Sequence, residues 1–298
     1  MAECSFSRQA CGRQCSVSHF AKRSLRQAIS RQPFCEAQPA ADDGAQVLAT
    51  LGGEVAEKGR FMDYVRILAI CFAAIGAGVI LGSGAVWFFN RIPGKWLCDY
   101  GQEPDEELLH PTRQRIRSTP WKYLFTGVFI VIGIYLGLKE PLYAVAALAS
   151  CWLLLEMSIA DIKYRIVPDQ LIMLLVLNAI GYIPYHNRGP LDGLWGAAIG
   201  FGVMLLMGIL GKIIYRKETL GGGDIKLFAA IGLCFGADGA VIVFILTTLL
   251  SAAHFCILLM KKRIKVSERK PMVPYITVSS AIYLVILHEM SYNIMVSL

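Results

Sequence analysis

The sequence predicts an all-α membrane protein, a polytopic bundle of about eight transmembrane helices. Hydrophobic residues make up 55% of the 298 residues and charged residues only 17%, more apolar than the core of a soluble domain requires. The apolar residues also gather in runs of about 20, the length that crosses about 30 Å of hydrocarbon. A soluble helical protein would spread them in amphipathic stripes instead.

Eight apolar runs are the candidate spans. In chain order they cover residues 65–89, 122–138, 141–160, 168–186, 191–215, 224–236, 239–260 and 272–290. The sixth run, DIKLFAAIGLCFG, is too short to cross a bilayer by itself. We therefore predict for it either a half-helix packed inside the bundle or a helix that is extended by its flanks.

Lys and Arg fall in alternate connecting segments, and this alternation predicts the orientation in the membrane. Basic residues follow the first, third, fifth and seventh runs, including KKRIKVSERK at 261–270. Because positively charged loops are retained in the cytoplasm, we expect these segments to be cytoplasmic and the turns between them to face outward. The net charge of +7 is explained in the same way, so a lipid bilayer is an expected partner and nucleic acid is not.

Residues 1–61 differ in composition from everything after them. They are polar, and they lack the continuous apolar region of a signal peptide. We expect this segment to be disordered or a non-native extension, with Met62 as the functional start. The rest divides into residues 62–121, a first transmembrane helix with a short cytoplasmic loop, and residues 122–298, a membrane-embedded core.

Two aspartates interrupt the apolar pattern on the same predicted side of the membrane. Asp161 ends the third run in IADIKYRIVPDQL, and Asp224 opens the sixth run in LGGGDIKLFAAIG. Two carboxylates within reach of one water can share a single proton. The ionised carboxylate then takes a proton from the water that attacks a carbonyl, while the protonated one protonates the leaving amine. This pattern is typical of an aspartyl protease.

Other interpretations of the aspartates stay open. Each could be a helix cap or a topology marker, and Asp224 would suit an N-terminal cap. That interpretation does not predict the three glycines at 221–223, which would let a substrate backbone approach Asp224 closely. A transporter or proton relay is the alternative from another class, because paired carboxylates also bind cations. From the helix dipoles alone, we expect Asp161 to be the more often protonated member of a pair.

These residues resemble the type IV prepilin peptidase family, which belongs to the GxGD membrane aspartyl proteases. The second motif of the family, GxGDxK, is matched by Gly221 or Gly222, Gly223, Asp224 and Lys226. The first motif is matched by Asp161, Val167, Pro168, Asp169 and Leu171. The stretches GSGAVWFFNRIPG and PMVPYITVSSAIYL extend the similarity over about residues 62–290. A presenilin-like protease would show Tyr before its first Asp and a Pro-Ala-Leu motif, and neither is present.

The resemblance implies a prepilin leader peptidase in the plasma (inner) membrane of a bacterium, with its active site facing the cytoplasm. Its substrates would be the prepilin or pseudopilin precursors of a type IV pilus or type II secretion system, which lose a short basic leader. Asp161 and Asp224 would be the catalytic pair, supported by the glycines, Lys226, Pro168 and Asp169. Proteolysis would need no cofactor. Some family members also methylate the new amino terminus with S-adenosylmethionine.

The loop after the first helix departs from the family pattern. Many members carry two CxxC pairs there that bind zinc, whereas this loop has only Cys98 and His110. Two such ligands do not complete a tetrahedral site, so we expect no metal.

Two further residues have weaker interpretations. Lys226 is on a different helix face from Asp224 and could touch substrate or lipid headgroups, and Glu156 is expected to have a structural role inside the bundle.

Overall fold

The structure is a computed structural model that describes residues 41–98, 115–186, 188–189, 191–216, 220–261 and 271–288, with the backbone alone for residues 41–60 and Tyr215. The chain divides into two compact units, Met1–Phe61 and Met62–Leu298, and each is described by itself. In the first unit, residues 41–61 belong to helix α2 (Ala41–Arg91). Our division of the chain, with residues 1–61 as a disordered or non-native extension, stays a prediction. Residues 1–40 lie outside the described residues.

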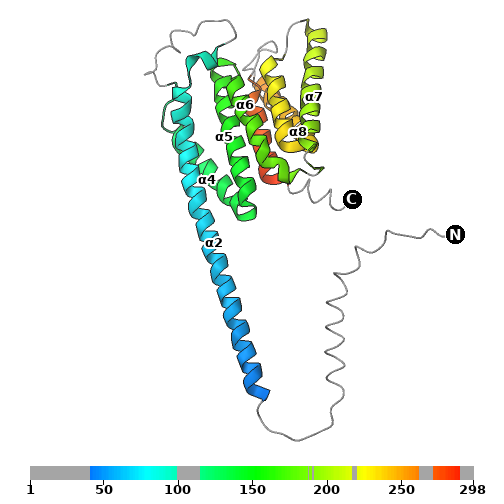
Figure 1. Cartoon of the computed structure of the whole chain (residues 1–298). Coiled ribbons are helices and arrows are strands. Elements are labelled where there is room, and N and C mark those ends of the chain that lie inside the picture. Colours follow the sequence, from blue (N-terminus) through cyan, green and yellow to red (C-terminus); the bar gives the residue numbers. More distant parts are fainter. Residues whose placement is uncertain are drawn as a thin grey trace, which may run out of the picture. The chain divides into compact units, whose positions relative to one another are not determined.

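All the regular elements that the structure describes are helical, which confirms the all-α fold (Figure 1). In chain order they are α2, η1 (Gly94–Leu97), α4 (Trp121–Lys139), α5 (Pro141–Tyr164), α6 (Asp169–Asn178), η2 (Ala179–Tyr185), α7 (Asp192–Tyr215), α8 (Gly222–Met260), α9 (Val273–Ile282) and η3 (Tyr283–Leu287). The elements η1 and η2 are 3₁₀-helical, and η3 is a π-helical turn.

Among the described residues, five helices are long and apolar enough to cross a membrane, so the chain is a multi-pass membrane protein. They cover Phe61–Arg91, Trp121–Lys139, Pro141–Tyr164, Asp192–Ile214 and Gly222–Met260. The predicted count of eight spans is not confirmed. Two of the predicted spans correspond to the shorter apolar segments Asp169–Tyr185 and Val273–Leu287, and two others are joined in α8.

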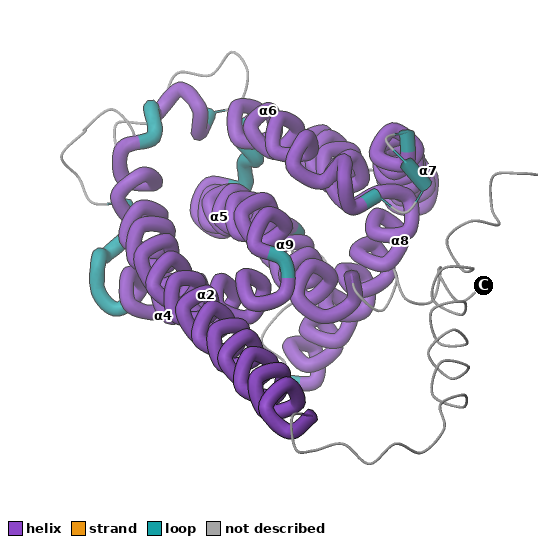
Figure 2. Tube along the Cα trace, turned by 60° about the horizontal axis from the view of Figure 1, so that its bottom comes forward, coloured by secondary structure: helices purple, strands orange, loops and turns teal. Residues whose placement is uncertain are grey.

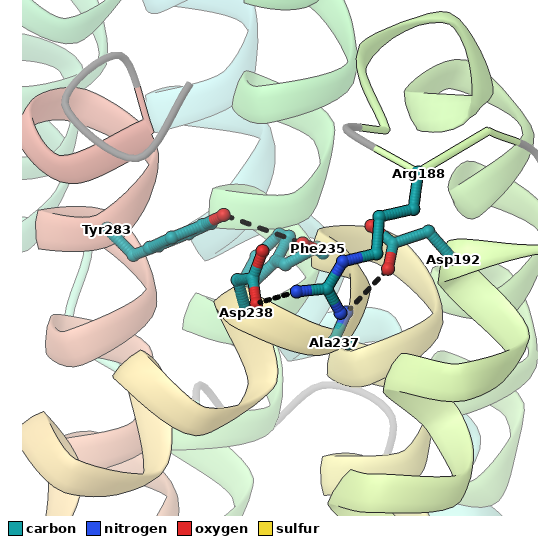
Figure 3. A network of polar contacts seen from close by, with 6 residues as sticks. All are labelled: Arg188, Asp192, Phe235, Ala237, Asp238 and Tyr283. Carbon is teal, nitrogen blue, oxygen red and sulfur yellow. Dashed lines mark hydrogen bonds and ion pairs between the residues drawn. The ribbon is translucent and has the colours of Figure 1, made fainter. Parts of the chain in front are cut away.

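A sharp turn at Gly236 divides α8 into two arms. Gly236 has φ 75° and ψ −178°, a conformation available almost only to glycine. The turn falls within the FGADG sequence between the sixth and seventh predicted spans. The buried carboxylate of Asp192, at the start of α7, accepts a hydrogen bond from the N–H of Ala237 at 3.4 Å (Figure 3). The sixth predicted span is therefore the short first arm of α8.

Helix α5 forms the centre of the bundle. It contacts α4, α6 and α9, and Figure 2 shows it surrounded by these helices. Its buried face carries small residues such as Ala147 and Ser150, which allow neighbouring backbones to approach closely. The hydroxyl of Tyr143 near its start donates to the carbonyl of Leu284 at 3.3 Å, and that of Thr277 donates to the carbonyl of Leu154 at 3.0 Å. These contacts show that α5 and α9 run antiparallel.

Candidate active site

Asp161 lies in the last turn of α5, where the helix meets the loop to α6. The N–H of Arg165, which adopts a left-handed conformation with φ 57°, donates to the carbonyl of Asp161 at 3.0 Å and ends the helix. Pro168 is buried and stands immediately before α6, with φ −65° and ψ 121°. Asp169 is the first residue of α6, where its charge complements the helix dipole.

Asp224 lies in the first turn of α8. Gly221 occupies the N-terminal cap position with an extended backbone, and Asp224 follows three residues later. The carboxylate of Asp224 accepts a hydrogen bond from the backbone N–H of Gly221. This is the reciprocal half of a capping box, in which the third helical residue reaches back to the cap. The cap position itself is held by Gly221 and not by Asp224.

The fold brings the two aspartates together from positions far apart in the sequence. Their carboxylates are close enough for their charges to repel one another. Asp161 is only 7% exposed, and its Oδ2 atom accepts a hydrogen bond from the N–H of Val273 at 2.9 Å. The N–H of Met272 also donates to this carboxylate. Two buried or partly buried carboxylates at one place, each held by backbone N–H groups, can share one proton.

The segments that carry the two aspartates touch at two further points. A Cβ atom added at Gly223 would lie 3.0 Å from the Cβ of Val167, a tighter contact than most side chains make, so the two segments pass close to each other here. The Nζ atom of Lys226 lies 2.8 Å from Oδ2 and 3.1 Å from Oδ1 of Asp169. At Gly222, by contrast, an added Cβ would meet no atom within 4 Å. Of the glycine motif, Gly222 thus faces open space and Gly223 packs against Val167, whereas a Cβ added at Gly221 would lie 3.5 Å from Oδ2 of Asp224.

Two groups near the aspartates were not identified as site residues from the sequence. The first is the amino-terminal end of α9, whose N–H groups hold Asp161. The prolines at 271 and 274 are its sequence signal, since proline favours the first turn of a helix. The second is Asn90, whose Oδ1 atom accepts the N–H groups of Arg115 and Ile116 at 2.8 and 2.9 Å.

Arg115 also connects the end of α2 to the end of α5. Its guanidinium donates to the carbonyl of Ile92 at 2.6 Å, and its own carbonyl accepts from Lys163 at 2.9 Å. Lys163 is two residues from Asp161. The stretch 82–94 is therefore tied to the end of α5 that carries the first aspartate.

Glu156 is the buried acid closest to Asp161 in the sequence of α5. It is fully buried, and neither of its carboxylate oxygens has a hydrogen-bond partner among the described residues. Its burial agrees with a position inside the bundle.

The described residues contain no group of three His, Cys, Asp or Glu side chains that could hold a metal ion. The thiol of Cys98 donates to the carbonyl of Gly94 at 3.2 Å. His110 lies outside the described residues.

Comparison with known proteins adds independent evidence. Residues 148–256 match the type IV leader peptidase family, a range that holds both aspartates. A protein of Xanthomonas campestris pv. campestris named "Prepilin leader peptidase/N-methyltransferase" is 30% identical over 252 residues, which cover 70% of this chain and 88% of that protein. Proteins of the same name in Stutzerimonas stutzeri and Aeromonas salmonicida are 27% and 29% identical over 45% and 55% of this chain.

The chain spans about half the length of these last two relatives, 47% and 57% respectively. No solved structure matches it. The similarity to the Xanthomonas protein extends over most of both chains, and the family match covers the helices that bring the two aspartates together. The chain therefore belongs to the type IV leader peptidase family.

Proposed function

We propose that this chain is an aspartic endopeptidase that removes the basic leader from prepilin or pseudopilin precursors. The observation that carries the proposal is that the fold brings the Asp161 and Asp224 carboxylates close enough for their charges to repel one another, with backbone N–H groups of a helix end beside each. The names of the relatives support the substrate class. The proposed location is the bacterial inner membrane, with the pair at the cytoplasmic face, because the loops on that side are basic.

In this mechanism one carboxylate is ionised and the other is protonated. The ionised group takes a proton from a water molecule, whose oxygen attacks the carbonyl carbon of the scissile peptide bond. The protonated group donates a hydrogen bond to the carbonyl oxygen and then gives its proton to the leaving nitrogen. The peptide C–N bond breaks, and the pair returns to its singly protonated state. The space at Gly222 would let the extended substrate backbone lie beside Asp224.

The aspartates keep their positions without any substrate side chain. Asp161 is fixed between the end of α5 and the start of α9, and Asp224 is fixed by its own helix cap. Such fixed positions supply the orientation that a water-activating pair needs. A metal ion is not required for these proton transfers.

We assign residues 122–298 to the peptidase core and residues 62–121 to a first transmembrane helix with its loop. Residues 1–61 are proposed to be dispensable. A chain that begins at Met62 should insert into the membrane and cleave a precursor as the full chain does. Loss of cleavage in a truncated chain that still inserts would show that the segment contributes to function.

The relatives are also named as N-methyltransferases, an activity for which S-adenosylmethionine would be the methyl donor. The described residues of the 82–94 stretch do not line a site for this cofactor: Phe89, Ile92 and Leu97 are at most 2% exposed and pack with Ala160 in a small apolar core. We therefore derive no step through S-adenosylmethionine.

The test is cleavage of a pilin-like precursor from the same organism, with enzyme and precursor in lipid vesicles and a chelator present. Intact mass would read loss of the leader and also any added methyl group. Asp161→Asn and Asp224→Asn should each abolish cleavage while the protein remains in the membrane, and the double variant should be hardly worse than either single one.

Asp238→Asn supplies the matched control, because it makes the same change in α8 beyond the turn at Gly236. It should cleave at the wild-type rate. If Asp161→Asn and Asp224→Asn both process the precursor normally, the protease proposal is wrong. Ion or proton flux through wild-type vesicles would then support the transporter alternative.

A further inference from the structure

The ion pair between Lys226 and Asp169 joins the two motif segments. Lys226 lies two residues after Asp224, and Asp169 lies eight residues after Asp161. The ammonium group bridges both carboxylate oxygens at 2.8 and 3.1 Å. The two side chains are 54% and 30% exposed, so the pair is neither buried in the core nor fully solvated.

A second contact also joins the two motif segments: Val167 packs against Gly223. Val167 and Asp169 flank Pro168, whose ring fixes φ near −65°. The segment 167–169 is thus a short rigid unit that contacts α8 by packing on one side and by charge on the other. It follows the end of α5 by only a few residues. The position of the first turn of α8 is therefore defined relative to the end of α5 through this unit.

We propose that Lys226 and Asp169 form a positioning pair, which holds the Asp224 carboxylate at the correct place and angle beside Asp161. This inference rests on the proposed function for its kinetic consequence. The two residues contact each other, and their effect on catalysis passes through the positions of the first turns of α6 and α8. The positive charge of Lys226 and the negative charge of Asp169 cancel within the pair. If each residue instead bound the precursor separately, the precursor would meet one positive and one negative charge.

The size of the effect follows from the geometry of catalysis. Displacing a catalytic group by about 1 Å lowers the rate about 10²-fold. Charge reversal at one member places two like charges in contact and should push the first turns of α6 and α8 apart. We expect kcat to fall by about 10²-fold in each single reversal, with KM within about threefold of the wild-type value.

The experiment compares Asp169→Lys, Lys226→Asp and the exchanged double variant in the vesicle assay with the pilin-like precursor. The exchange restores an ion pair with reversed polarity, so kcat should recover at least tenfold relative to either single variant. Recovery will be incomplete, because a lysine at the start of α6 opposes the helix dipole. Lys226→Arg keeps the charge and should retain most of the activity.

A second ion pair that involves α8 provides the control. Asp238 lies just beyond the turn at Gly236, and its carboxylate is 3.1 Å from the guanidinium of Arg188, which precedes α7 (Figure 3). The side chains of Arg188 and Asp238 are 54% and 30% exposed, the same fractions as in the first pair. Arg188→Asp and Asp238→Arg should leave kcat and KM unchanged. Equal losses from the two pairs would identify a general effect on folding and would overturn the proposal.

Two other results would overturn it. Single reversals that raise KM and leave kcat unchanged would show that the residues bind the precursor. An exchanged variant that is folded but no more active than the single variants would show that the residues do not act as a pair.

A readout without substrate separates this inference from the proposed function. Infrared difference spectra over a pH titration report the protonated carboxyl band of the aspartates, assigned by its loss in Asp161→Asn and Asp224→Asn. The band should shift in each single reversal, return in the exchanged variant and stay unchanged in the Arg188 and Asp238 variants. If the wild type cleaves no precursor, the proposed function fails and the band alone decides the role of the pair. An unchanged band in all variants refutes it.

Discussion

Replacing Gly223 by Ala tests whether close packing of the two motif segments sets the geometry of the aspartates. The added Cβ would lie 3.0 Å from the Cβ and 3.4 Å from the Cγ2 of Val167. Carbon atoms in contact prefer about 3.5–4.0 Å, so the two segments must give by a few tenths of an ångström. A shift of about 1 Å lowers the rate about 10²-fold, which corresponds to about 2.7 kcal/mol of barrier, and this is the upper limit of the expected loss.

The effect on stability should be smaller than the effect on the rate. Alanine has a higher helix propensity than glycine by about 0.8–1.0 kcal/mol, and this gain offsets part of the strain. The variant should therefore remain folded and in the membrane. Its slow cleavage would then reflect misplacement of Asp224 rather than unfolding.

Single-turnover cleavage of the pilin-like precursor measures the change. Adding Val167→Gly removes the atom that is contacted, so the double variant should regain at least tenfold in rate over Gly223→Ala. Gly202→Ala is the control, because an added Cβ there meets no atom within 4 Å and the position lies in α7. Wild-type cleavage by a folded Gly223→Ala variant, or a loss that Val167→Gly does not relieve, would refute the reasoning.

Two further predictions concern stability. Gly236→Ala should lower the midpoint of thermal unfolding, because its φ of 75° and ψ of −178° cost a non-glycine residue about 1–3 kcal/mol and the added Cβ would clash with Asp192; an unchanged midpoint would contradict this. Asp161→Ala should be less stable than Asp161→Asn by about 1–3 kcal/mol, because only Asn keeps an acceptor for the buried N–H of Val273. Equal denaturant midpoints in the two variants would show that this hydrogen bond does not hold α9.

The helical class and the two aspartates could be predicted because both are encoded locally. Run length and composition identify apolar helices without knowledge of their neighbours. Asp161 and Asp224 break such runs, so they are visible in the sequence alone. The FGADG sequence likewise indicated the turn that Gly236 makes, although that turn joins two arms of one element.

The tertiary partners of the aspartates could not be predicted from the sequence. The helix-dipole argument assigned the shared proton to Asp161 by considering only the helix that each aspartate ends or opens. The structure adds the start of α9, whose N–H groups favour a negative charge on the same carboxylate, so the dipole argument no longer assigns the proton. Lys226 was likewise judged from its helix face, which gave no indication of Asp169, 57 positions earlier.

The hydrogen bonds of Asn90 make this region suitable for protein engineering. They hold residues 115 and 116 directly against the end of α2, so Arg115 is fixed by the core on one side of residues 99–114. Lengthening a closed loop costs only about 0.6 kcal/mol for each doubling. A separately folding fluorescent or affinity module inserted there should leave α2 and α5 in place. The stretch between Cys98 and Arg115 is therefore a rational insertion point for labelling the protein without displacing its aspartates.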